Sequence, residues 1–321
     1  MDNTNMGQRS DFLLLSEKAL TRASYHDVFN HFLITRFNVR SQTGFDNVFP
    51  NNQDASLDEA YLKYRFSLFD AYAYPTVSSQ SSTNFKWIVL YDVHTPQSCK
   101  ERIRMYSKWT NFIPVFIKEF DEKTIQNIVN QNMSGNPRYI ITTRMDNDDG
   151  ICRDYIKMIQ DNFQEKHGEL INFFFGYYVT HPGGKLYLRG RSVNTFASLI
   201  EKSDEFHTIY FSEQLPHHKL HNVYKSRGLL RNIMLKDSMP AWLVVFHEGN
   251  LANSSDINNG LRQMRNRIQE NFDVKLDKNL HKENRILILL DQLLFHIRHQ
   301  RVVIVILKLI GKLRIIFGKI K

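Results

Sequence analysis

The chain has 321 residues, a formal net charge of +9 and two cysteines, together with 23 Phe and 14 Tyr. Two cysteines exclude a disulfide framework and a cysteine-rich zinc site, and they favour a reducing compartment. The high aromatic content indicates a folded globular protein. The first residues, MDNTNMGQRSDF, lack a positively charged segment that leads into an apolar stretch, so no signal peptide is predicted and a cytoplasmic location is expected.

The positive charge is concentrated at the C-terminus. From His281 to Lys321 there are nine Lys or Arg and two Asp or Glu, a net charge of 9 − 2 = +7, which leaves 9 − 7 = +2 for the other 280 residues. A nucleic-acid-binding fold more often spreads its Lys and Arg over a docking face. We therefore predict no nucleic-acid partner.

The first half of the chain alternates predicted strands and helices. Apolar, β-prone runs predict strands over 31–39, 85–92, 111–117 and 138–146. Helical spacing predicts helices over 57–72, 97–108 and 121–133, and a further helix directly behind residues 146–149. Such alternation predicts an α/β fold with a mostly parallel sheet covered by helices on both faces.

The second half changes character. Residues 170–190 predict a hairpin of two aromatic-rich strands joined at 182–184. A histidine-rich loop is predicted at 216–221. Its residues His217, His218 and His221 are either solvated or part of a loop that covers the bound acceptor substrate. A short apolar strand is predicted within PAWLVVFHEGN, residues 240–250.

The run ITTRMDNDDG, residues 141–150, places three carboxylates directly behind a predicted strand. A solvated Asp/Asn turn is the plain interpretation. An EF-hand loop fails, because counting from Asp146 puts Gly150 fifth, Ile151 sixth and Lys157 twelfth. An aspartate nucleophile of a phosphotransferase and a divalent-metal site that holds a diphosphate stay open, since neighbouring carboxylates repel unless a cation or solvent offsets their charge.

Three predicted strands end in polar side chains. Arg36 and Asn38 end the first, Asp92 the second and Asp146 to Asp149 the fourth. Ligands of parallel α/β sheets bind beyond the carboxyl ends of the strands. These side chains are therefore expected to face one crevice.

Four segments, LITRFN, FKWIVLYDVHTP, ITTRMDNDDG and PAWLVVFHEGN, resemble in this order the putative rhamnosyltransferase family of bacterial proteins. That family resembles the GT-A glycosyltransferases, and residues 146–149 resemble the D-x-D-D metal motif of family 2. The resemblance implies a GT-A-like, Rossmann-related domain over 28–255, an N-terminal extension over 1–27 and a helical, basic C-terminal tail over 256–321. The sequence departs from the family where "NPF" is replaced by Asn194-Thr195-Phe196.

The resemblance implies a metal-dependent glycosyltransferase that moves a sugar, with rhamnose as a candidate, from a nucleoside-diphosphate donor to a glycan or lipid-linked acceptor. Mn²⁺ or Mg²⁺ would stabilise the charge on the leaving diphosphate. We expect Asp148 as a direct metal ligand, Asp146 on the metal or the ribose, and His247 as a further metal ligand. For His247, the plain alternative is a hydrogen-bonded structural residue.

We expect the polar side chains at the strand ends, Asn38 among them, to bind the nucleoside-diphosphate donor. The resemblance suggests that Asp92 contacts the nucleoside, although a turn-forming Asp is equally consistent with its position. Arg36 and Arg144 could each neutralise phosphate through the planar guanidinium, or pair with an Asp.

A transferase that inverts the sugar needs a carboxylate base. Glu201 is the first candidate, with Asp204 and Glu248 behind it, and the plain alternative is an exposed acid at a helix end. Asp149 is a second catalytic candidate, or it caps the following helix.

The tail from Arg285 onward is apolar with sparse cations, and its uncharged runs are too short to span a membrane. Helical spacing puts five cations on one stripe: Arg298, Arg301, Lys308, Lys312 and Lys319. This pattern is typical of a helix in an anionic membrane interface, which predicts a peripheral protein at the inner face of the cell membrane. The alternative is packing on the domain or in a homo-oligomer.

Two other functions stay open. A nucleotidyl- or phosphotransferase could use the same carboxylates, and a catalytically silent sugar-binding or scaffold protein could keep the fold without the reaction.

Overall fold

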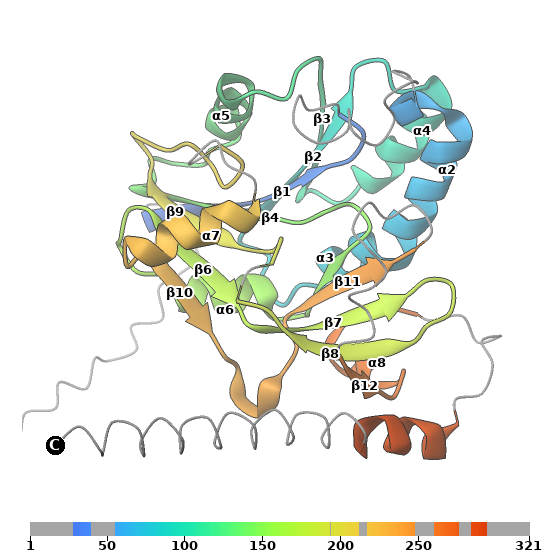
Figure 1. The fold of residues 1–321 in the computed structure, drawn as a ribbon. Coiled ribbons are helices and arrows are strands. Elements are labelled where there is room, and N and C mark those ends of the chain that lie inside the picture. Colours follow the sequence, from blue (N-terminus) through green and yellow to red (C-terminus); the bar gives the residue numbers. More distant parts are fainter. Residues whose placement is uncertain are drawn as a thin grey trace, which may run out of the picture.

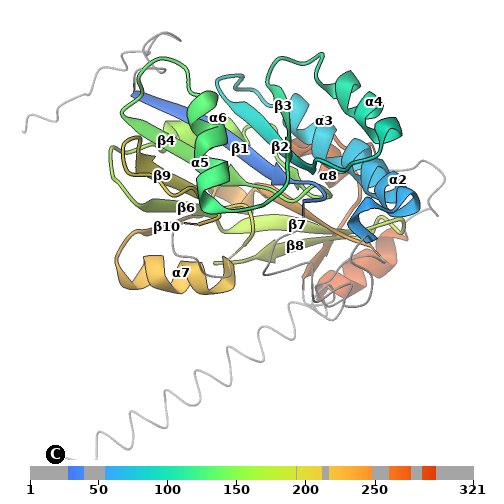
Figure 2. The ribbon, with the colours of Figure 1, turned by 90° about the horizontal axis from the view of Figure 1, so that it is seen from above.

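The computed structural model describes residues 28–39, 55–192, 194–211, 217–247, 260–275 and 284–293. Two sheets and the helices around them form one α/β unit (Figures 1 and 2). This confirms the predicted α/β class. The expected N-terminal extension over 1–27 and the tail beyond residue 293 lie outside the described ranges.

The larger sheet has seven strands in the order β10-β6-β9-β4-β1-β2-β3. β1 is parallel to β2 and β4, and β2 is parallel to β3, whereas β9 is antiparallel to β4 and β6. Its strands are β1 (Phe29–Arg36), β2 (Lys86–Asp92), β3 (Phe112–Ile117), β4 (Tyr139–Arg144), β6 (Glu169–Phe173), β9 (Ser198–Lys202) and β10 (Leu230–Ile233). The four strands predicted in the first half are therefore confirmed within a few residues.

A second sheet of five strands, in the order β12-β8-β7-β11-β5, was not predicted. Its strands are β5 (Gly150–Ile151), β7 (Phe175–Thr180), β8 (Leu186–Gly190), β11 (Trp242–Phe246) and β12 (Leu261–Gln263). The predicted hairpin is the β7–β8 pair, but Gly176 of β7 also lies beside Trp242 of β11. A Cβ added to Gly176 would lie 1.9 Å from the Trp242 ring, so only glycine allows this pairing.

Helices cover both faces of the larger sheet. One face packs against α2 (Glu59–Leu68), α3 (Tyr74–Ser78), α4 (Gln97–Tyr106) and α6 (Tyr155–Asp161), and the other packs against α5 (Glu122–Gln131). The π-helical turn η2 (Phe69–Ala73) joins α2 to α3, so the predicted helix over 57–72 continues further. At its start, Asp58 accepts a hydrogen bond of 2.8 Å from the Tyr61 backbone N–H, as is typical of an N-cap.

Two predictions about loops and helices are wrong. Residues 217–226 form helix α7 (His217–Ser226), which includes the three histidines expected in a loop. The helix expected directly behind residues 146–149 begins later, as α6 at Tyr155, because residues 150–151 pair with β11 as strand β5.

The folded unit continues past the expected boundary at residue 255. β12 pairs with β8. Helix α8 (Arg267–Asn271) follows, and the main core includes Ile268 from this helix and Phe272 directly after it. Short 3₁₀ turns occupy η1 (Ala55–Leu57) and η3 (Lys236–Ser238), and a last described helix covers 285–293. Within the described ranges, no helix has the length and apolar character needed to cross a bilayer.

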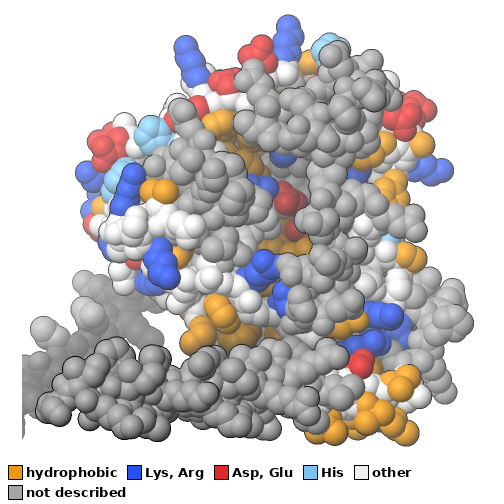
Figure 3. All heavy atoms as spheres, in the orientation of Figure 1, with side chains coloured by type: hydrophobic (Ala, Val, Ile, Leu, Met, Phe, Trp, Pro, Cys, Tyr) orange, Lys and Arg blue, Asp and Glu red, His pale blue; other side chains and the backbone are white. Residues whose placement is uncertain are grey.

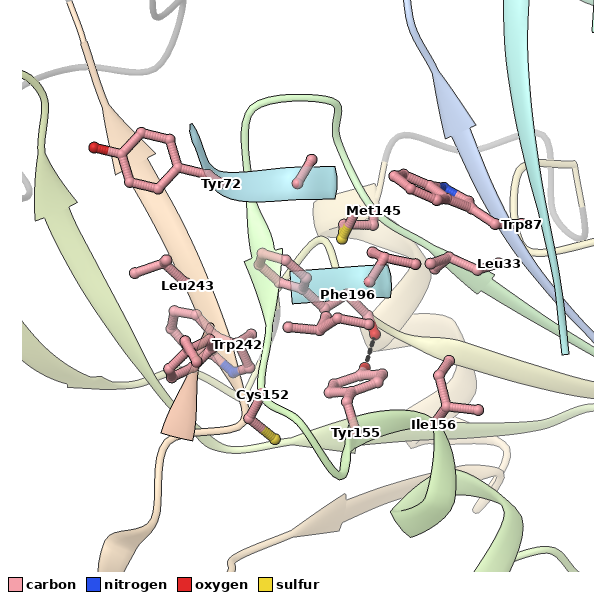
Figure 4. Close-up of a cluster of buried hydrophobic side chains, with 14 of the residues drawn as sticks. Leu33, Tyr72, Trp87, Met145, Cys152, Tyr155, Ile156, Phe196, Trp242 and Leu243 are labelled. Atoms are coloured by element: carbon pink, nitrogen blue, oxygen red, sulfur yellow. Dashed lines mark hydrogen bonds between the residues drawn. The ribbon is translucent and has the colours of Figure 1, made fainter. Parts of the chain in front are cut away.

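The main core joins the two sheets (Figure 4). Trp242 of β11 stacks on Phe196 with ring centroids 5.7 Å apart, and its indole N–H donates to the Phe173 carbonyl at 2.8 Å. The Tyr155 hydroxyl donates to the Phe196 carbonyl. These contacts fix β11 against the larger sheet, and with it the residue that follows β11, His247.

Candidate active site

The segment behind β4 meets helix α2 at Asp148. Arg65 of α2 contacts both oxygens of this carboxylate: Nη1 donates a hydrogen bond of 3.2 Å to Oδ2, and Nη2 forms an ion pair with Oδ1 at 3.1 Å. Both side chains are 13% exposed. A two-pronged contact of this kind is the strongest geometry for an Arg–carboxylate pair.

His247 lies on the other side of Asp148, directly after β11. Its side chain is fully buried, and its Nε2 atom lies 2.8 Å from Asp148 Oδ2 and 3.3 Å from Arg65 Nη1. The Tyr64 ring packs edge-on against the imidazole at 5.4 Å. The structure therefore brings together Asp148 and His247, as predicted, at the end of β4.

Charge keeps Asp148 ionised. Burial alone would raise the pKa of its carboxyl, but Arg65 and His247 outweigh burial and lower that pKa below its ordinary value. Burial would likewise lower the pKa of Arg65, yet Asp148 raises it. Asp148 is thus a buried carboxylate in its charged form, which suits a cation ligand.

Asn147 and Asp149 hold this loop in place. Asn147 donates to the Phe37 carbonyl at 2.7 Å and accepts from Arg65 Nη2, so it links the end of β1 to α2. Asp149 accepts from the Val245 backbone N–H at 2.9 Å, which ties the loop to β11. Asp149 does not cap a helix and is buried in that contact, and its catalytic role stays a prediction. Burial, Asp148 and Asp146 together raise the pKa of the Asp149 carboxyl well above its ordinary value.

Asp146 is the most accessible carboxylate of the loop, with 38% of its side chain exposed. It accepts from Arg144 Nη2 at 3.2 Å, and the Arg144 guanidinium lies over the Tyr210 ring at 5.3 Å. Arg36 stacks over Phe120 at 5.3 Å. Burial and then the neighbouring Arg144 lower the pKa of Arg36, with Tyr210 and Asp146 acting in the opposite direction. Two guanidinium groups therefore lie near one open carboxylate at these strand ends.

Asn38 has a structural role in place of the predicted donor contact. It is fully buried, its Nδ2 donates to the Ser56 carbonyl at 3.3 Å and to Thr95 Oγ1 at 3.1 Å, and its Oδ1 accepts from the Asp92 backbone N–H at 3.2 Å. Asp92 itself accepts from the His94 backbone N–H at 2.8 Å. These bonds hold the ends of β1 and β2 together and place Asp92 beside the turn that follows.

Glu201, the first candidate for the catalytic base, lies far from the cluster. It lies in strand β9, not at a helix end, and pairs with Ile140 near the start of β4, whereas Asp146 follows the end of β4. Along β4, the three-residue step from Ile140, the partner of Glu201, to Thr143 alone covers about 10 Å. Both carboxylate oxygens accept backbone N–H groups, from His207 and Thr208, at 2.9 Å each. Burial raises the pKa of Glu201 to about 7.

The two further candidates for the base differ in whether the structure describes them. Asp204 is an exposed residue in the turn behind β9. Glu248 lies outside the described residues.

Arg65 is the site residue that sequence reasoning missed. It stands three residues after Leu62 and four before Phe69, so the helical period places it on the buried side of α2. A single arginine on the apolar side of a predicted helix indicates a buried cation that needs an acidic partner, and this signal was present in the sequence.

The cluster could hold a divalent cation through two protein ligands. Asp148 Oδ2 and His247 Nε2 are 2.8 Å apart, a separation that neighbouring ligands of one ion can adopt, and a carboxylate with an imidazole suits Mn²⁺. Among the described residues, no group of three His, Cys, Asp or Glu is arranged to hold a metal. The other ligands would have to come from donor oxygens and water.

Among solved structures, S. aureus TarS 1-349 in complex with UDP-GlcNAc is 14% identical, with a TM-score of 0.41 over 72% of this chain and 63% of that one. The mannosyltransferase PcManGT from Pyrobaculum calidifontis in complex with GDP-Man and Mn²⁺ is 9% identical, with a TM-score of 0.37 over 71% of this chain and 59% of that one. This chain thus spans less than two thirds of either structure's length.

No curated protein matches the sequence. The model of the family described as "Putative rhamnosyl transferase" matches residues 30–250, well over half of the chain, and includes the four segments that suggested this family. The chain therefore belongs to the putative rhamnosyl transferase family.

Proposed function

We propose that the protein is a glycosyltransferase that uses a nucleoside-diphosphate sugar, with rhamnose as the first donor sugar to test. The observation that carries the proposal is the ionised Asp148 carboxylate held against His247 at the end of β4. It lies within the segment that matches the family. A buried carboxylate and imidazole beyond the carboxyl ends of parallel strands are suited to holding the cation of a diphosphate donor.

Mn²⁺ or Mg²⁺, bound at Asp148 and His247, would act as a Lewis acid on the leaving diphosphate. Arg36 and Arg144 supply positive charge for the phosphates, and the open Asp146 side chain is available to the metal or to the ribose. Asp92, at the end of β2, would contact the nucleoside.

A base for the acceptor hydroxyl is needed in addition if the transfer inverts the sugar. We assign this role to Glu248, because it follows His247 directly in the chain. The acceptor would be a glycan or a lipid-linked glycan.

The test is a donor screen on the full-length protein. UDP-, GDP- and dTDP-linked sugars, rhamnose included, are added with and without Mn²⁺, and the melting temperature and the products are recorded. A matching donor should raise the melting temperature by mass action in the presence of metal, and should yield a glycosylated acceptor by mass spectrometry. Stabilisation that is unchanged by EDTA would refute the metal site. Release of a sugar phosphate or nucleotidylated product would favour the phosphotransferase, and no binding of any donor would favour the scaffold.

We further propose that the C-terminal tail docks on an anionic membrane surface. Helix 285–293 is attached to β12 through the Gln292 side chain, which donates to the Arg262 carbonyl at 2.8 Å, and its Ile288 side chain is buried. The helix leaves five apolar side chains 47–69% exposed: Ile286, Leu287, Leu289, Leu290 and Leu293. A hydrophobic patch lies at the place of this helix, at the lower right of Figure 3. The five-cation stripe that follows in the sequence lies outside the described residues.

Binding to vesicles would test this proposal. Attraction of about 1 kcal/mol per surface cation adds to apolar burial, and salt screens it over about 8 Å at physiological ionic strength. Reversing the charge of Arg301, Lys308 and Lys312 should release the protein from anionic vesicles at low salt and leave transfer to a soluble acceptor unchanged. A wild-type protein that ignores such vesicles, or a variant whose mass in light scattering changes instead, would favour the homo-oligomer.

A further inference from the structure

A side-chain cation already occupies the position proposed for the metal. Arg65 Nη1 lies 3.2 Å from Asp148 Oδ2 and 3.3 Å from His247 Nε2, and these two atoms are 2.8 Å from each other. The three atoms form a nearly equilateral triangle. The guanidinium thus contacts the same oxygen and the same nitrogen that a divalent ion would bind.

This arrangement cannot satisfy His247. If Nε2 carries the lone pair, it accepts from Arg65 but faces the lone pairs of Asp148. If Nε2 carries the proton, it donates to Asp148 but faces the Arg65 N–H group. Either tautomer leaves one unfavourable contact, whereas a metal ion would attract the lone pairs of both atoms.

The guanidinium is also incompletely bonded. Its Nε atom is buried and has no hydrogen-bond partner among the described residues. A buried donor without a partner costs stability, so the present position of Arg65 is a compromise that another anion could relieve. The diphosphate of a donor is such an anion.

We propose that Arg65 is a resident counter-ion that competes with the metal. Without ligands it neutralises Asp148 and keeps Asp148 and His247 together. A divalent ion binds when the guanidinium moves away, and the donor diphosphate favours that move by accepting its N–H groups. Arg65 is then a positioning residue that makes metal binding depend on the nucleotide. This inference rests on the proposed function.

The test measures Mn²⁺ affinity of the full-length protein by electron paramagnetic resonance, with and without a nucleoside diphosphate. Arg65→Met should bind Mn²⁺ about tenfold more tightly than wild type, within the usual range of coupling between two ligands. A nucleoside diphosphate should tighten Mn²⁺ binding in wild type more than in Arg65→Met. Arg36→Met is the matched control for Mn²⁺ binding, because it removes one positive charge from the same strand ends, where Arg36 stacks over Phe120.

If Arg65→Met and Arg36→Met increased the Mn²⁺ affinity equally, the change in net charge alone would explain the increase, and the inference would be overturned. Unchanged or weaker Mn²⁺ binding in Arg65→Met would overturn it too, while the metal site itself would stand. If no variant bound Mn²⁺ in any condition, both the metal site and the inference would fall. Arg65→Lys, which keeps the charge but lacks the planar fork, should give a smaller gain of about threefold, and it provides the same comparison if Arg65→Met does not fold.

Discussion

Asp148 and Glu201 are both buried carboxylates on the strands of the larger sheet or just behind them, yet they differ in protonation and in partners. Asp148 contacts Arg65 and His247, and its pKa is lowered despite burial. Glu201 accepts two backbone N–H groups, and burial raises its pKa to about 7. Asp148 lies behind the carboxyl end of β4, whereas Glu201 faces the start of that strand.

The difference separates two uses of a buried acid. By accepting backbone N–H groups, Glu201 holds the turn around Thr208, where φ is +71°. These N–H groups do not compensate for the loss of solvation of a full charge. A guanidinium and an imidazole do so at Asp148. Burial and an acidic residue type are therefore insufficient to identify a reactive carboxylate, and the charge of its neighbours decides.

The largest effect that distinguishes the two carboxylates should come from Asp148→Asn. Losing the anionic ligand should reduce transfer about a hundredfold or more, since metal stabilisation of the leaving group contributes several kcal/mol and each 1.4 kcal/mol is about tenfold in rate. Rates of product formation at saturating donor and Mn²⁺ measure this loss. Asp161→Asn, an exposed residue paired with Lys157, is the matched control and should keep the wild-type rate. A variant at Asp148 with near-normal turnover would rule out the site.

The same substitution corrects an expectation about stability. Counting the carboxylates alone predicts that Asp148→Asn relieves repulsion and raises the melting temperature. Arg65 reverses that prediction, because the variant leaves a buried guanidinium without its anionic partner. The melting temperature should fall.

A smaller effect should appear at Glu201, and it concerns stability alone. The folded pKa of about 7 lies above the ordinary glutamate value of 4.5, so the protonated carboxyl stabilises the fold fully below the unfolded pKa, and this contribution is lost as the pH rises through about 7. The loss amounts to roughly 3 kcal/mol at most. Glu201→Gln cannot ionise and should lack this term. Urea unfolding of both proteins at about pH 5 and about pH 8.5 gives the difference. Equal pH dependence in the two proteins, or a large loss of transfer in the variant, would contradict the comparison.

Much of the framework that positions Asp148 was predictable. Continuous apolar runs such as FKWIVLYD predict buried parallel strands, and their polar ends locate the crevice, because both signals are local in the sequence. The family resemblance rested on the same segments and is confirmed by the match over 30–250.

The second sheet and the pairing of Arg65 with Asp148 were not predictable, for a common reason, although the helical period indicates that Arg65 lies on the buried side of α2. Trp242 pairs with Gly176, and Arg65 meets Asp148 across 83 residues, so neither contact leaves a pattern within a local window. Glu201 was misplaced because SLIEK is short, and a short apolar run does not distinguish a strand from the end of a helix.

The smallest effect is expected at Asp149, which lies beside Asp148 but resembles Glu201 in its bonding. Its Oδ1 accepts the Val245 N–H at 2.9 Å, and the side-chain oxygen of asparagine can accept the same bond. Asp149→Asn should therefore keep the loop tied to β11 and change transfer by less than about threefold, whereas loss of a true general base costs about a hundredfold or more. Asp149→Ala removes the bond and should raise the KM for the donor by displacing Asp148, while Asp149→Asn should not. Steady-state kinetics of the two variants measure both quantities. If Asp149→Asn were as inactive as Asp148→Asn, Asp149 would be a catalytic carboxylate, and the contrast between charged and backbone partners would not account for the site.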